Sequence, residues 1–242
     1  MNKVLIFSIL AIFLLHGCIY SVNQSAIKGN GTSTREFRAV TSFNKIEIAS
    51  GAFSVYLSQG EVESVELEID ENLQQYVDVR NEGSTLVIEV KENVTFDNKT
   101  KNNIFVTVQN IDLFSVTGAC NLKTETPLNC ESFTLNVQGV INGDLELYCT
   151  DFNVIIAGVS NFVVIGSAKE LNIRLEGVGN FNSSKFIAAK VDVENSGVGS
   201  VNIHATEELS MTNTGIGSVT YSGEAEIKKI DASGIGKIKK AE

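Results

Sequence analysis

The chain has 242 residues, with 29 Asp and Glu against 19 Lys and Arg, so its formal net charge is −10. An acidic chain with few arginines is poorly suited to the nucleic-acid phosphate backbone, and we expect no nucleic-acid partner. One Pro, no Trp and 20 Gly suit short strands joined by tight turns. The length is enough for one elongated domain with a large core.

Residues 1–17 are predicted to be a lipoprotein signal peptide. Lys3 is followed by the uncharged stretch 4–15, which is too short to span a bilayer but is typical of a signal peptide. The stretch ends in Leu-His-Gly-Cys, which resembles the bacterial lipobox and makes Cys18 the predicted lipidation site. His16 is unusual in that pattern. The alternative is an ordinary signal peptide cut elsewhere, with Cys18 incidental.

Residues 18–36 are predicted to be the lipidated cysteine and a flexible tether, because they are small and polar. The membrane is therefore an expected partner, through the N-terminal lipid. Ile19 stands where an Asp favours inner-membrane retention in many Gram-negative bacteria. We expect an outer-membrane lipoprotein of the cell envelope, periplasmic or surface-facing.

Residues 37–112 are predicted to be a β-rich N-terminal part with hairpins and a meander. Apolar residues alternate with charged ones, as in Val65, Leu67 and Ile69, which is typical of half-buried strands. The stretch 71–77 is the one helix-like segment, and the polar stretch 92–103 is expected to be a loop.

Residues 113–242 repeat about every 19 residues and are predicted to form regular coils. In each repeat an apolar alternation leads to a glycine, usually followed by Val or Ile and a small polar residue. The marker glycines are Gly118, Gly139, Gly158, Gly177, Gly197, Gly215 and Gly234, with separations of 21, 19, 19, 20, 18 and 19 residues. A fixed period with strand-like content indicates stacked coils that cannot fold singly.

Aligning the repeats predicts two inward-facing columns of apolar residues, because alternate residues of a strand share a face. The first column is Phe133, Phe152, Leu171, Val191, Leu209 and Ile230. The second is Leu135, Val154, Ile173, Val193, Met211 and Ala232. A further short strand after each glycine is marked by Leu122, Phe162, Phe181, Val201, Val219 and Ile238. Coils stacked at ~4.8 Å give parallel ladders. The predicted fold is therefore all-β, a single-domain parallel β-helix or β-solenoid.

The glycines are expected at the corners of the coil, where positive φ or close backbone approach is needed. A polar residue follows three positions later in each repeat, and stacking would join these residues in a hydrogen-bonded ladder. The predicted ladder is Asn121, Asn142, Asn161, Asn180, Ser200 and Ser218. The alternative is the ordinary preference of Asn and Ser for turns, without a ladder.

Cys130 and Cys149 occupy the same position one coil apart, at a Cα separation of about 5 Å that is compatible with a disulfide. The alternative is a pair of packed free thiols. Mostly small residues continue this column, namely Ala168, Ala188, Thr206 and Ile227.

No catalytic or metal-binding constellation emerges, and no cofactor is expected. Beyond the signal peptide His204 is the only histidine, and the acidic residues alternate along strands and do not cluster in a calcium loop. The coils hold a single arginine, Arg174, whereas carbohydrate-cleaving β-helices typically line a groove with Asp, Lys and Arg.

Four stretches together resemble the autotransporter adhesin head GIN domain family, common in Bacteroidetes lipoproteins. They are FNKIEIASGAFSVYLSQG (43–60), STLVIEV (84–90), IFVTVQNIDLFSVTGAC (104–120) and the GVGN and GIGS coils. The resemblance covers 37–238. It implies a β-helix-like fold, an exported or surface location and a role suggested by the word adhesin, but it transfers no functional residues.

The sequence thus favours a non-enzymatic, lipid-anchored cell-envelope β-solenoid that acts as a binding, adhesion or structural module. Its partner would be an unidentified protein or glycan, and homo-oligomerisation through a side face is left open. Two alternatives stay open: a β-helix enzyme acting on polysaccharide, and an envelope sensor or scaffold protein.

Overall fold

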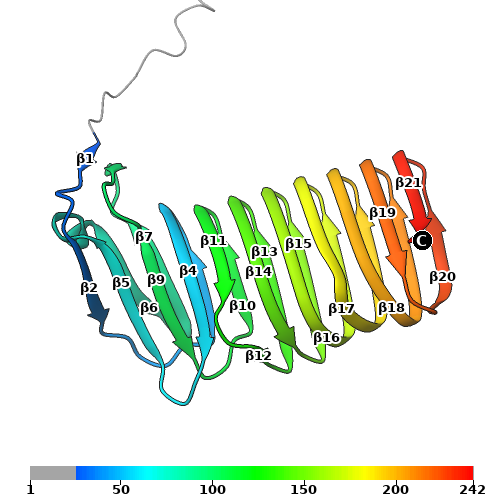
Figure 1. Ribbon diagram of the computed structural model, residues 1–242, viewed down its shortest axis with the longest axis horizontal. Helices are drawn as coiled ribbons and strands as arrows, with labels where there is room; N and C mark the ends of the chain where they lie inside the picture. Colours follow the sequence, from blue (N-terminus) through cyan, green and yellow to red (C-terminus); the bar gives the residue numbers. More distant parts are fainter. Residues whose placement is uncertain (1–25, 242) are drawn as a thin grey trace, which may run out of the picture.

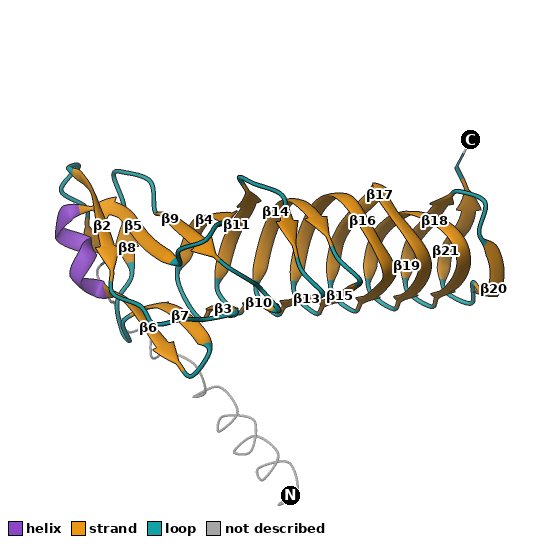
Figure 2. Cartoon of the chain, turned by 90° about the horizontal axis from the view of Figure 1, so that it is seen from below, coloured by secondary structure: helices purple, strands orange, loops and turns teal. Residues whose placement is uncertain are grey.

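The computed structural model describes residues 26–241, which form a long rod of stacked coils with one short helix at the N-terminal end (Figures 1 and 2). Nearly all strands belong to one sheet of 19 strands, and a second sheet has two. Cys18 and the predicted signal peptide lie outside the described residues. Within the described part of the chain, no helix is both long and apolar enough to cross a membrane.

The regular part of the rod consists of parallel strands that wind along both faces of each coil. Their bounds are β10 Leu113–Val116, β11 Ala119–Thr124, β12 Leu128–Asn129, β13 Ser132–Val137, β14 Val140–Tyr148, β15 Asp151–Ile156, β16 Val159–Leu175, β17 Val178–Asn195, β18 Val198–Asn213, β19 Ile216–Ser222, β20 Glu226–Asp231 and β21 Ile235–Lys240. In β16, β17 and β18 one strand continues around the bend, so each covers most of a coil. The predicted β-solenoid with coils of about 19 residues is confirmed.

The first apolar column follows the predicted register through five coils. Phe133 lies opposite Phe152, and the column continues through Leu171, Val191 and Leu209, all buried. The rings of Phe133 and Phe152 stack with centroids 5.7 Å apart, which adds aromatic contact to the burial of apolar area.

The last coil departs from the predicted register. Ile227 lies opposite Leu209, and Ile230 lies opposite Met211, so Ile230 and Ala232 do not hold the places that the alignment gave them. The pairing skips Lys228 at an irregularity between Leu209 and Ser210. A bulge of this kind places the apolar Ile227 in the column and leaves the lysine outside it.

The marker glycines stand where consecutive corners touch. A Cβ built on Gly158 would lie 2.0 Å from the carbonyl oxygen of Gly139, closer than any side chain tolerates. The same oxygen accepts a 2.9 Å hydrogen bond from the N–H of Val159, which ties the two corners together. Close backbone approach, and not positive φ, is therefore what these positions require.

Parallel stacking begins before residue 113, where the sequence placed the start of the regular coils. Strands β3 Lys45–Ile48 and β4 Ala52–Gln59 pair in parallel with β10 and β11. On their other side they pair in parallel with β7 Thr85–Val90 and β9 Asn103–Val108. The first coils thus stack in an order that differs from their order along the chain.

Antiparallel strands and the helix close the N-terminal end of the rod. Their bounds are β2 Ser33–Arg38, β5 Ser64–Asp70, β6 Val77–Glu82 and the 3-10 helix η1 Glu71–Tyr76. Strand β2 pairs with β5, β5 with β9, and β6 with β7, all antiparallel. The predicted hairpins and short helix are thus present, and they cover the edge that the first coil would otherwise expose.

The described part of the predicted tether 18–36 is folded. It contains β1 Ile27–Lys28 and the first four residues of β2, and β1 pairs with β8 Phe96–Asp97 inside the predicted loop 92–103. The buried carboxylate of Asp70 accepts N–H bonds from Gly31 at 2.6 Å and from Thr100 at 3.0 Å. Burial raises the pKa of Asp70, but the hydrogen bonds from Thr100, Gly31 and Lys99 together lower it by more. The net pKa shift is therefore downward.

The corner contact makes a direct prediction for stability. Gly197→Ala would place a Cβ 2.1 Å from the carbonyl oxygen of Gly177. We expect it to lower the free energy of unfolding by about 1–3 kcal/mol or more, as overpacking does. Thermal or urea unfolding followed by circular dichroism measures the change. Ser196→Ala, one residue away on an exposed position, is the matched control. Equal stability of the two variants would contradict the role given to the corner.

Candidate functional site

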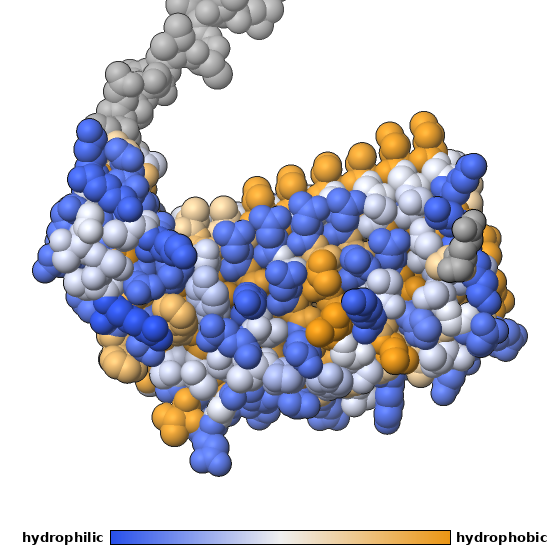
Figure 3. All heavy atoms as spheres, viewed as in Figure 1, coloured by the Kyte–Doolittle hydropathy of each residue, from blue (hydrophilic) through white to orange (hydrophobic). Residues whose placement is uncertain are grey.

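One face of the rod carries the predicted row of polar residues, and we call it the ladder face. It is formed by β4, β11, β14, the first halves of β16, β17 and β18, and β19. Asn121, Asn142, Asn161, Asn180, Ser200 and Ser218 lie in register along it, each opposite the next. In Figure 3 a row of hydrophilic residues runs along this face.

Most neighbours in this row are joined by side-chain hydrogen bonds. The amide of Asn142 donates to Asn121 Oδ1 at 3.2 Å, and the amide of Asn180 donates to Asn161 Oδ1 at 3.0 Å. Between them Asn161 donates to Asn142 at 3.5 Å, and the hydroxyl of Ser200 donates to Asn180 at 2.6 Å. Each carboxamide has two N–H donors and two lone pairs. A ladder bond to each neighbour leaves one donor and one acceptor facing solvent.

A shallow groove of about 500 Å³ lies beside the asparagines. Its floor is the buried column of Leu122, Gly143 and Phe162, between the asparagines and the outward-facing row of Lys123, Asp144 and Val163. A Cβ on Gly143 would lie 2.0 Å from the ring of Phe162, so the ring fills the space under the missing side chain. The groove therefore has an apolar floor and an amide-rich wall.

Aromatic rings mark the N-terminal end of the ladder face. Tyr56 lines the groove, and its ring stacks on Phe105 with centroids 5.0 Å apart and planes at 15°. The guanidinium of Arg35 lies 3.7 Å from the centroid of the Phe105 ring, and its Nε is 2.6 Å from a Glu66 carboxylate oxygen. The stack holds Tyr56 in place, and Lys123 lies in register beside Tyr56 on the side away from Phe105.

The sequence of this chain matches a known protein family. Residues 42–225 match the family described as "Putative auto-transporter adhesin, head GIN domain". The chain belongs to this family. The resemblance predicted from the sequence is thus confirmed, and no curated protein sequence matches the chain.

Solved structures of putative adhesins share the fold of this GIN domain. One from Bacteroides fragilis is 25% identical, with a TM-score of 0.84 and coverage of 89% of this chain and 100% of that chain. One from Parabacteroides merdae is 21% identical (TM-score 0.65, coverage 90% and 99%), and one from Parabacteroides distasonis is 20% identical (TM-score 0.61, coverage 90% and 100%).

Two further asparagine pairs, outside the predicted row, join adjacent coils among the described residues. On the opposite face the amide of Asn172 donates to Asn153 Oδ1 at 3.1 Å. Inside the rod the amide of Asn195 donates to Asn213 Oδ1 at 2.9 Å, both side chains being buried. Asn195 continues the column of Leu175 and Ile156, so an amide at an apolar position of the repeat was the available signal for this buried pair.

The predicted cysteine pair lies on adjacent coils, and Cys120, Cys130 and Cys149 all carry free thiols in this structure. A hydrogen bond from Cys149 lowers the pKa of the Cys130 thiol, against the opposing effects of burial and of Asp112. The same hydrogen bond, with burial, raises the pKa of Cys149. Burial raises the pKa of Cys120 to about 12.

The alanines of the same region show a second departure from the alignment. Ala168 lies opposite Ala188, and Ala188 opposite the buried Ala205. Thr206, which the sequence placed in this column, is exposed, because the register shifts after Ala188. Ile227 lies opposite Leu209 in the neighbouring column.

The other side chains that could take part in catalysis or metal binding do not form a cluster among the described residues. The imidazole Nδ1 of His204 lies 2.8 Å from the hydroxyl oxygen of Ser222. Within residues 26–241 no group of three or more His, Cys, Asp or Glu side chains could hold a metal ion. The ladder face and its groove are therefore the best candidate for a functional site.

The thiols should react in a fixed order, since alkylation requires the thiolate. With iodoacetamide at pH 8 we expect Cys130 to be modified first, and Cys120 only after unfolding. For Cys130, whose pKa is lowered, the rate should level off at a lower pH than for an ordinary thiol. Peptide mapping by mass spectrometry measures each site, and mapping without reduction reports any bond between Cys130 and Cys149. Modification of Cys149 before Cys130 would contradict the assigned pKa order.

Proposed function

We propose that this GIN domain is a lipid-anchored, non-catalytic binding module of the cell envelope, and that its ladder face binds a glycan. The observation that carries the proposal is the row of carboxamides beside a groove that ends at a stacked tyrosine. Membership of an adhesin family supports a location at the cell surface or in the envelope.

The chemistry of the ladder face suits a hydroxyl-rich chain. Each of Asn142 and Asn161 receives and donates one ladder bond, and keeps a donor and an acceptor for a ligand. Because the carboxamides repeat at the coil spacing of ~4.8 Å, they offer the same pair of groups at regular intervals. Tyr56 adds aromatic surface to the lining of the groove, which a sugar ring could contact with its C–H groups.

The composition of the groove supports binding over cleavage. Glycoside hydrolysis commonly uses two carboxyl groups about 5–10 Å apart on either side of the bond. Among the described residues that line the groove, Asp144 is the only acid, and it lies in register with Lys123 and Val163. One carboxylate does not supply the pair of groups for acid and base roles.

Glycan binding can be tested on an array with the protein purified from cells that express the full chain. We expect retention without cleavage products, and a loss of at least tenfold in affinity for Asn142→Ala/Asn161→Ala. Asn153→Ala/Asn172→Ala is the control for the opposite face, where it removes the one bond between these asparagines, whereas the test variant removes three ladder bonds. Retention that both double variants weaken equally would contradict the assignment to the ladder face. Cleavage products would instead support the alternative of a β-helix enzyme that acts on polysaccharide.

Anchoring can be tested separately at Cys18. Cys18→Ser removes the predicted acylation site, and we expect the protein to move from the membrane fraction to the soluble fraction. Intact-protein mass spectrometry should show acyl chains on the unchanged protein only. A variant that stays in the membrane fraction would count against lipidation at this residue. Protease added to intact cells then distinguishes a surface-facing protein, which is cut, from a periplasmic one.

A further inference from the structure

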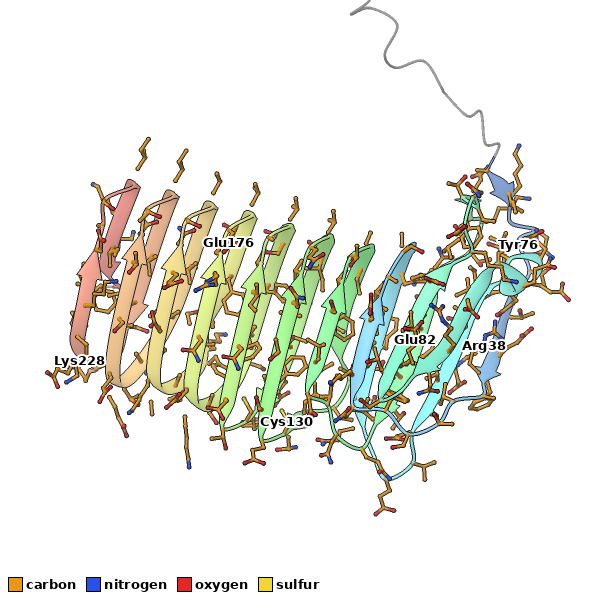
Figure 4. All side chains as sticks on the ribbon, turned by 180° about the vertical axis from the view of Figure 1, so that it is seen from behind. Arg38, Tyr76, Glu82, Cys130, Glu176 and Lys228 are labelled. Atoms are coloured by element: carbon orange, nitrogen blue, oxygen red, sulfur yellow. The ribbon has the colours of Figure 1, made fainter. Side chains whose placement is uncertain are left out.

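An uninterrupted row of exposed apolar side chains runs along one edge of the rod, at the corner that follows the marker glycines. We call it the apolar ridge. Its members lie in register, each opposite the next: Val140, Val159, Val178, Val198, Ile216 and Ile235. Between 45% and 74% of each residue is exposed. Figure 4 shows side chains that project from this edge, close to the labelled Glu176.

The ridge is bordered by residues with very little charge, in a chain whose net charge is −10. On one side lie the asparagines and serines of the ladder, up to Lys237 in the last coil. On the other side the exposed residues are Gln138, Ala157, Glu176, Ser196, Thr214 and Ser233. A single acid and a single lysine therefore border the entire row. An edge with so few charged groups can be buried in an apolar phase without burying many unpaired charges.

The shape of the ridge argues against a second copy of this chain as its occupant. A stable protein interface buries about 800 Å² on each partner, commonly around a well-packed centre. The ridge is one side chain wide, and its members are about half exposed, so two ridges would bury much less. A planar, fluid apolar phase fits a narrow straight row better than a second rod does.

The N-terminal end of the described chain lies on the same edge. The corner of the ridge continues through Ala119 to Ala52, where the segment 89–98 lines a hollow together with Ala52. Strand β1 pairs with β8 inside that segment, and Figure 1 shows β1 at the upper edge of the rod. The described chain begins one residue before β1, so residues 1–25, with the predicted lipidation site Cys18, join the domain on the side that the ridge occupies.

We propose that the apolar ridge is a membrane-contacting edge, which enters the boundary between headgroups and acyl chains of a phospholipid bilayer. This inference rests on the membrane anchoring proposed above. The lipid would anchor one end of the chain, and the ridge would add buried apolar area that holds the rod along the membrane surface. The rod then lies along the membrane, with the ladder face turned to its side.

A tryptophan can report the surroundings of the ridge, because the chain has none of its own. Val178→Trp places one on the ridge, at a position that is 50% exposed. Val163→Trp is the matched control, at a position on the ladder face that is 45% exposed. Both proteins are purified from cells that express the full chain and reconstituted with vesicles of phosphatidylethanolamine and phosphatidylglycerol, with or without brominated acyl chains.

We expect the emission of the tryptophan at 178 to shift to the blue on vesicles and to fall at least twofold with brominated lipid. The tryptophan at 163 should change little. Equal quenching of both, or quenching of neither on vesicle-bound protein, would overturn the ridge proposal alone. Protein that does not co-sediment with vesicles would overturn the anchoring and the ridge together. A blue shift at 178 that depends on protein concentration in detergent would assign the ridge to a second copy.

Discussion

The structure depends on how closely the backbone of one coil approaches the next at the corner. The N–H of Val159 reaches the carbonyl oxygen of Gly139 at 2.9 Å, and the equivalent bond from Val178 reaches Gly158 at the same distance. A side chain on these glycines would push the corners apart, and the strand hydrogen bonds on both sides of the corner would be lost with them. The glycine period therefore sets the register, and the register sets what stacks on what.

Because register is kept, any residue type that recurs in the repeat becomes a line along the rod. The interior lines bury Phe133, Phe152 and their equivalents, which supplies most of the stabilisation. The exterior lines form the ladder face and the apolar ridge, which lie side by side because their residues are two positions apart in each repeat. The two surfaces could thus act together, with one edge held at a membrane and the neighbouring face presented to a ligand.

The sequence predicted the features that repeat and missed those that interrupt the repeat. The columns through Phe133 and through Asn142 follow from the strand period of two and the coil length alone. The predicted register of the last coil was wrong because Lys228 is bulged out of the pairing. A bulge cannot be recognised in a sequence whose apolar and polar residues alternate imperfectly. The stacking of β7 and β9 beneath β3 and β4 depends on non-local pairing, which periodicity does not encode. The fold of residues 27–36 depends on Asp70, whose distant backbone partners could not be inferred from spacing.

Pulsed electron paramagnetic resonance between pairs of nitroxide labels tests in-register stacking most directly. Asn121 and Ser218 are five register steps apart on the ladder face, and Thr134 and Lys229 are five steps apart on the opposite face. At ~4.8 Å a step, stacked coils predict backbone separations of about 24 Å for both pairs. Two narrow distributions near that value would support the account. Separations that differ strongly between the faces, or broad distributions, would contradict it.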